Sequence, residues 1–169
     1  MDGTHQKSSC LPSRFALRAA TPFGTTEKAY RVFVEELPPV VKPGEQPTGV
    51  RVLTKMGIPI FLSPPRPAAQ AILEQVGLQD GKLSFRLRNS GTSHFVAEKI
   101  FVRGFGSGGD VVLDQQLNGW YVLAGRTHSY EIAVPDAECA RMTTTAVEVQ
   151  IGKSVLRERL QVPQASCTP

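Results

Sequence analysis

The sequence predicts an all-β protein made of immunoglobulin-like β-sandwiches, one incomplete on the N-terminal side and one complete on the C-terminal side. Three observations carry this prediction. Apolar and polar residues alternate along many short segments, which is the period of half-buried strands. Turn-forming residues separate these segments at short intervals, as they do in antiparallel sandwiches. A helical apolar period is weak and confined to residues 68–76.

The N-terminal part contains three predicted strands, at residues 14–19, 27–37 and 48–62. An immunoglobulin-like sandwich uses about seven strands, so three cannot close one alone. We therefore expect residues 14–63 to form the last part of a first domain that is incomplete, poorly ordered or completed by another chain.

The third predicted strand has a long apolar face. Counted by twos, the side chains on this face are Val50, Val52, Thr54, Met56, Ile58, Ile60 and Leu62. Pro59 has no N–H to donate, which places the strand at or near a sheet edge. An apolar edge strand recruits another chain unless it is covered. The segment is thus predicted to be either a protected edge or a binding device.

A proline-rich connector at residues 63–67 divides the chain, because its prolines lack N–H donors and stiffen the backbone. Beyond it, residues 68–169 are expected to form the second sandwich. Residues 82–89 alternate clearly between apolar and polar. Further strands are predicted within residues 94–105, 111–114, 119–125, 127–134, 145–151 and 154–162.

Charge and hydropathy indicate neither a nucleic-acid partner nor a membrane span. The 19 Lys and Arg residues are scattered among 15 acidic residues, giving a net charge of +4 without a basic block. No run of 18 apolar residues exists to span a bilayer. The first residues also lack the apolar region of a secretory signal.

The sequence offers no constellation that favours an enzyme, a cofactor or a metal. The glycines at 104, 106 and 109 have dinucleotide-binding spacing, but a strand follows them instead of a helix, so we predict a hairpin turn. No histidine lies in a recognisable nucleophile motif. Glu35 and Glu36 are adjacent and point to opposite faces of a strand, which excludes them as an acid and base pair.

Cysteine spacing leaves the redox state open. Cys10, Cys139 and Cys167 allow three pairings, each of which leaves one thiol over. Three reduced thiols are the remaining alternative. No Cys and His spacing indicates a metal site.

Two neighbouring segments carry a family resemblance. Residues 30–38 (YRVFVEELP) and 49–61 (GVRVLTKMGIPIF), joined by a polar, proline-rich loop, resemble the end of the first domain of periplasmic chaperones for fimbria and pilus assembly. The IPxF-type ending is most similar to the archaic subgroup. Since the match begins only near residue 14, the resemblance implies an N-terminally truncated copy or a wrongly placed start.

The resemblance implies a function by donor-strand complementation in the periplasm, with pilin or fimbrial subunits as partners and possibly an outer-membrane usher. Val50, Val52, Thr54 and Met56 would then fill successive pockets of an unfinished subunit. Arg31 would anchor the carboxylate at the end of that subunit. Chaperones of this type often carry a disulfide in the second domain, which implies the pair Cys139 and Cys167.

Alternatives to each of these interpretations stay open. Many of these chaperones place a lysine where this chain has Pro59, and their first-domain arginine would fall before the matched region. Arg31 is equally well interpreted as an ordinary surface arginine paired with Glu35 or with acidic residues that flank the lysines. Trp120 and Tyr121 form either an aromatic recognition surface or, as we favour, the cover of one end of the core. The whole chain is alternatively a structural or adhesive β-sandwich module, or a non-functional chaperone fragment.

Overall fold

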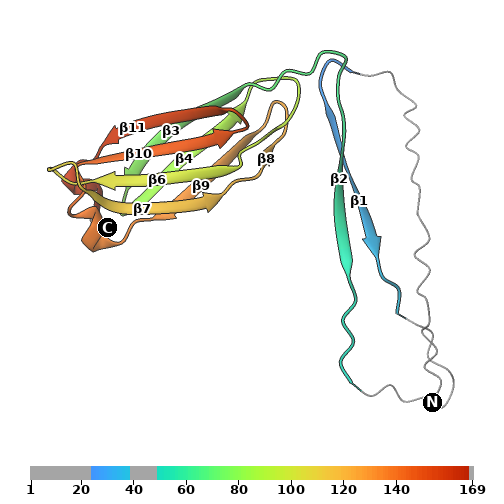
Figure 1. Ribbon diagram of the computed structural model, residues 1–169, viewed down its shortest axis with the longest axis horizontal. Helices are drawn as coiled ribbons and strands as arrows, with labels where there is room; N and C mark the ends of the chain where they lie inside the picture. Colours follow the sequence, from blue (N-terminus) through green and yellow to red (C-terminus); the bar gives the residue numbers. More distant parts are fainter. Residues whose placement is uncertain (1–23, 39–48, 168–169) are drawn as a thin grey trace, which may run out of the picture.

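The computed structural model describes residues 24–38 and 49–167, and strands make up most of these described residues. A two-stranded hairpin extends away from a β-sandwich (Figure 1). The all-β prediction is thereby confirmed. The predicted strand at residues 14–19 lies outside the described residues.

Two antiparallel sheets form the sandwich. The four-stranded sheet has the order β11-β10-β6-β7 and consists of β6 (Lys99–Phe105), β7 (Val111–Asn118), β10 (Thr144–Ile151) and β11 (Ser154–Gln161). The three-stranded sheet has the order β3-β4-β9 and consists of β3 (Ala71–Gln79), β4 (Lys82–Asn89) and β9 (Thr127–Ala133). A short pair, β5 (Phe95–Val96) with β8 (Tyr121–Val122), lies at one end. This order of strands fits an immunoglobulin-like sandwich.

The core lies between the two sheets and follows from the alternation in the sequence. Each inner face contributes every second residue of its strands, and the outer residues are polar or half-exposed. Leucine, phenylalanine, isoleucine and valine dominate the fully buried positions, namely Leu83, Phe85, Leu87, Ile100, Val102, Val147 and Val149. The predicted strands at residues 82–89, 127–134, 145–151 and 154–162 coincide with β4, β9, β10 and β11 within a few residues.

Most of the weak helical pattern at residues 68–76 lies in a strand, because β3 begins at Ala71. β3 pairs with β4, but its register shifts between Glu74 and Gly77. Gln75 sits in this bulge with φ +55°. An inserted residue breaks the period of two, so the apolar side chains on either side no longer alternate along the sequence.

The glycine-rich segment after β6 is a tight turn, as the sequence predicts. The Gly106 N–H donates to the Asp110 carbonyl at 2.9 Å, and the Gly109 N–H donates to the Gly106 carbonyl at 3.0 Å. Gly109 has φ +80°, a conformation that favours glycine. β7 follows directly, so no helix N-terminus exists here to hold a phosphate.

β1 (Lys28–Glu35) and β2 (Lys55–Leu62) form the hairpin, with Tyr30 opposite Ile60 and Val34 opposite Met56. The expectation of one continuous strand over residues 48–62 is wrong for the described residues 49–54, which are not in a strand. Apolar alternation alone does not make a strand, since a strand also needs a partner for its backbone groups.

Asn89 ties together the loops at the end of the sandwich beside the hairpin. Its Nδ2 donates to the carbonyls of Ser93 at 2.8 Å and Val122 at 2.9 Å, and its Oδ1 accepts from the Gly91 N–H at 2.9 Å. The side chain is fully buried. Because these groups lose their partners in the Asn89→Ala variant, we expect a loss of about 2 kcal/mol in unfolding free energy.

Urea denaturation checks this expectation. The matched variant Asn118→Ala changes an exposed asparagine at the end of β7 and should leave the transition midpoint unchanged. Equal midpoints for both variants would show that the Asn89 network does not stabilise the fold.

Candidate functional site

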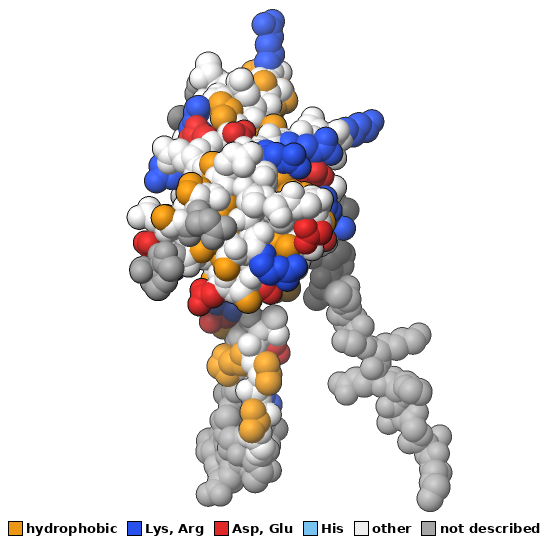
Figure 2. All heavy atoms as spheres, turned by 90° about the vertical axis from the view of Figure 1, so that its left-hand side faces the viewer, with side chains coloured by type: hydrophobic (Ala, Val, Ile, Leu, Met, Phe, Trp, Pro, Cys, Tyr) orange, Lys and Arg blue, Asp and Glu red, His pale blue; other side chains and the backbone are white. Residues whose placement is uncertain are grey.

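One face of the hairpin is apolar and, within the described residues, partly to largely exposed. Because directly opposite residues of an antiparallel pair share a face, the register joins two sets of side chains into one surface. We call this surface the apolar hairpin face; its members are Tyr30, Val32, Val34, Met56, Ile58 and Ile60. Met56 is 53% exposed, and Tyr30 and Ile58 are almost as open. Orange side chains are visible on the hairpin below the sandwich (Figure 2).

The segment before β2 adds further exposed apolar side chains. Val50 is 97% exposed and Val52 is 81% exposed. Pairing with β1 continues one step beyond the strand, because the Glu36 N–H donates to the Thr54 carbonyl at 2.9 Å. Of the four predicted donor residues, only Met56 lies within β2, while Val50, Val52 and Thr54 lead into it.

The hairpin also presents unpaired backbone. Within the described residues β2 pairs only with β1, so its outer edge offers N–H and carbonyl groups to another strand. An isolated two-stranded hairpin is marginally stable in water. An edge of this kind beside an apolar face has the chemistry needed for strand addition by a partner.

The opposite hairpin face is polar toward its tip. Lys55 Nζ lies 3.1 Å from Glu35 Oε2 and 5.6 Å from the centre of the Phe33 ring. A Cβ at Gly57 would lie 3.2 Å from both Arg31 Cδ and Phe33 Cε1, so these two side chains cover the glycine. Glu35 is therefore the partner of Lys55, and the pairing of Arg31 with Glu35 is wrong.

Arg31 lies where the hairpin meets the sandwich. Its Nη2 donates to the hydroxyl of Tyr121 in β8. Among residues 24–38 and 49–167, no carboxylate forms an ion pair with this guanidinium. A guanidinium has five N–H donors, so one hydrogen bond leaves capacity to bind a carboxylate through two of them.

Contacts of Glu27 attach the start of β1 to the sandwich. The sequence does not predict these contacts. The Glu27 side chain is 2% exposed, and its Oε1 lies 2.8 Å from His94 Nδ1 and accepts from the His94 backbone N–H at 3.1 Å. The Glu27 N–H donates to the Thr92 carbonyl at 2.8 Å. The Phe61 ring, near the end of β2, stacks on the His94 ring with 3.8 Å between centroids. The residue just before β1 and the end of β2 therefore contact the same loop.

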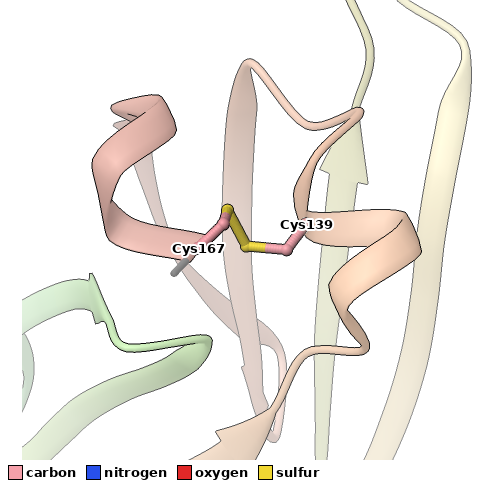
Figure 3. The surroundings of a disulfide bond; sticks show 2 residues. All are labelled: Cys139 and Cys167. Atoms are coloured by element: carbon pink, nitrogen blue, oxygen red, sulfur yellow. A yellow bond between two sulfur atoms is a disulfide. The ribbon is translucent and has the colours of Figure 1, made fainter. Parts of the chain in front are cut away.

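The cysteines implied by the resemblance are bonded in the structure. Cys139 ends the short helix α1 (Asp136–Cys139), and Cys167 ends the 3₁₀ helix η1 (Gln164–Cys167). Figure 3 shows the bond joining these two helices. It closes the chain over a sequence separation of 28 residues and holds η1 against α1.

Trp120 does not cover the core, contrary to the interpretation favoured from the sequence. Its side chain is 57% exposed, and its ring lies 5.2 Å from that of Tyr121. Its carbonyl accepts from the Ala97 N–H at 3.0 Å, and Val122 fills the interior instead. The exposed Trp120 ring therefore lies next to the half-buried Tyr121, whose hydroxyl contacts Arg31.

Other kinds of site receive no support from the described part of the chain. No group of His, Cys, Asp or Glu residues there is arranged to hold a metal ion. Neither helix in that part has the length and apolar character that crossing a membrane requires. The sequence matches no protein-family model and has no significant similarity to a curated protein.

Proposed function

We propose that this chain is a chaperone for pilus or fimbrial subunits that acts by donor-strand complementation. The observation that supports this most strongly is the unpaired edge of β2 together with the apolar hairpin face beside it. A subunit whose sandwich lacks one strand has an apolar groove and two unpaired edges. The segment from Val50 to Met56 enters that groove. Its apolar side chains fill the groove, and its backbone pairs with the two open edges.

The energetics favour this role over a free hairpin. Burying about three large apolar side chains contributes roughly 1.5–3 kcal/mol each, and each ladder bond adds about 1 kcal/mol net. The apolar hairpin face is continuous from β1 to β2, so the subunit core extends over side chains of both strands. The hairpin thereby gains the partner layer that it lacks in the described residues.

Arg31 is proposed to anchor the carboxylate at the C-terminus of the bound subunit. Its place at the corner between hairpin and sandwich suits a chain end that runs along β2 toward β8. The Arg31→Ala variant should bind the subunit about tenfold more weakly, because it loses the bidentate, charge-assisted hydrogen bonds to the subunit carboxylate.

Binding of a subunit that ends in a C-terminal amide provides the control for the Arg31 prediction. The amide should weaken the wild-type complex and leave the Arg31→Ala complex unchanged. The variant Arg126→Ala, which changes an exposed arginine of the sandwich, should bind as wild type. If the amide and Arg31→Ala each weaken binding and their losses of binding free energy add up, Arg31 does not bind the C-terminal carboxylate.

Localisation to the periplasm is part of the proposal and is supported by the disulfide. Bonded Cys139 and Cys167 are typical of proteins that fold in an oxidising compartment. An outer-membrane usher is the proposed second partner, since it would receive the subunit from the chaperone.

A structural or adhesive β-sandwich module is the second candidate, and a non-functional chaperone fragment is the third. The self-sufficient core between the two sheets favours the module, because that core needs no hairpin to close it. Co-expression with pilin subunits of the source organism separates the candidates. A one-to-one complex supports the chaperone, whereas subunits that aggregate in its presence as in its absence contradict it.

A further inference from the structure

A shallow hollow lies on the outer face of the four-stranded sheet, over β6, β10 and β11. Its volume is about 370 Å³, which is at the lower end of the range for ligand sites. Aromatic rings and guanidinium groups line it together, namely Phe101, Phe105, Arg103, Arg157 and Arg159. The hairpin contributes none of its lining residues.

Strand register explains why the sheet is hollow here. Ala146 in β10 is paired with Arg103 on one side and with Arg159 on the other. Its methyl group forms a low floor between two long side chains. Phe101 and Phe105 lie two residues before and after Arg103 on β6, so their rings rise at either end of that floor.

The rings hold two of the guanidinium groups in place. Arg103 lies 5.5 Å from the Phe101 centroid, and Arg159 lies 5.1 Å from the Phe105 centroid. Arg103 Nε also lies 3.5 Å from Asp114 Oδ1. For Arg159, no ion pair with a carboxylate is present among the described residues.

The third arginine of the hollow is already engaged. Arg157 Nε donates to Glu148 Oε2 at 2.7 Å. Glu148 shares the outer face of the sheet with the three arginines. Glu158 is paired with the buried Val147, so its side chain alternates to the other face of β11 and its charge is not in the hollow. Arg157 is held by Glu148 and Arg103 lies beside Asp114, so Arg159 is the arginine of the hollow that is left without an ion pair among the described residues. One such guanidinium suits a ligand with a single negative charge.

We propose that this hollow binds a peptide segment of a partner protein in which an acidic residue adjoins an aromatic residue. The acidic side chain accepts hydrogen bonds from the Arg159 guanidinium. The aromatic ring lies on Ala146 between Phe101 and Phe105, where it is shielded from water. This site is separate from the hairpin and does not depend on the chaperone proposal.

Titration of the ¹⁵N-labelled full chain with two synthetic peptides tests the site by NMR. The probe is acetyl-Gly-Phe-Glu-Gly-amide, and its neutral match is acetyl-Gly-Phe-Gln-Gly-amide. We expect saturable shifts of the backbone amides at residues 101–105, 146–148 and 157–159, with at least fivefold weaker binding of the neutral peptide. The Arg159→Gln variant should bind the acidic peptide about tenfold more weakly.

Two controls keep the result specific. Arg126→Gln removes an exposed arginine elsewhere on the sandwich and should leave binding unchanged. Thermal melts should coincide for both variants, since neither changes the core. Three results would overturn the proposal: equal affinity for the two peptides, tighter binding of inorganic polyphosphate, or shifts that do not saturate. Arg157 and Arg159 would then be charges that protect the edge strand β11 from pairing with other chains.

Discussion

Replacing Val52 with aspartate should abolish capture of a pilin subunit while leaving the sandwich folded. The chaperone proposal places this side chain in an apolar groove, where an unpaired carboxylate costs several kcal/mol and the valine contribution is also lost. Val52 is 81% exposed in the free protein, so its own fold loses no packing. Co-purification of the subunit with the tagged chain measures the effect.

Val155→Asp is the matched control for this experiment. Val155 is a partly exposed valine on β11, outside the hairpin, and the same change of chemistry there should leave capture intact. Unchanged co-purification with Val52→Asp would refute the donor-strand role. Loss of capture with both variants would indicate a general effect of added negative charge.

Removing the disulfide should produce the largest loss of stability. The chain-entropy relation for a loop of 28 residues gives about 3.5 kcal/mol for the Cys139→Ala, Cys167→Ala double variant. Buried Cys139 also leaves a small void beside the core when it is shortened to alanine. Guanidinium denaturation of the double variant against wild type measures this loss.

The remaining cysteine supplies the control. Cys10→Ala should have the stability of wild type, and dithiothreitol should destabilise Cys10→Ala but not the double variant. Wild-type stability that does not respond to the reductant would show that the bond contributes nothing to folding. It would also remove the support that the bond gives to a periplasmic location.

Local sequence pattern predicts much of the second sandwich. β4 and β10 alternate strictly because one face of each packs against the opposite sheet, and that periodicity is visible residue by residue. β3 is not predicted in this way, because the bulge at Gln75 breaks the alternation of apolar and polar residues along the strand. The start of β2 at Lys55 also could not be predicted, since the pairing limit depends on how far β1 extends.

The same distinction between local pattern and long-range contacts applies to the candidate sites. The apolar character of Met56 and Ile58 is visible from alternation, and their exposure follows from the missing partner layer. The contact between Glu27 and His94 is not predictable, because it joins residues 67 positions apart. The hollow over Ala146 needs the register of three strands, which no single segment encodes.

The most direct test of the central claim is amide hydrogen exchange of the chain with and without a captured pilin subunit. The account predicts fast exchange at residues 49–58 in the free protein and protection of about a hundredfold or more in the complex, because a new ladder forms along the β2 edge. Protection confined to the sandwich, with residues 49–58 still exchanging freely in the complex, would contradict it.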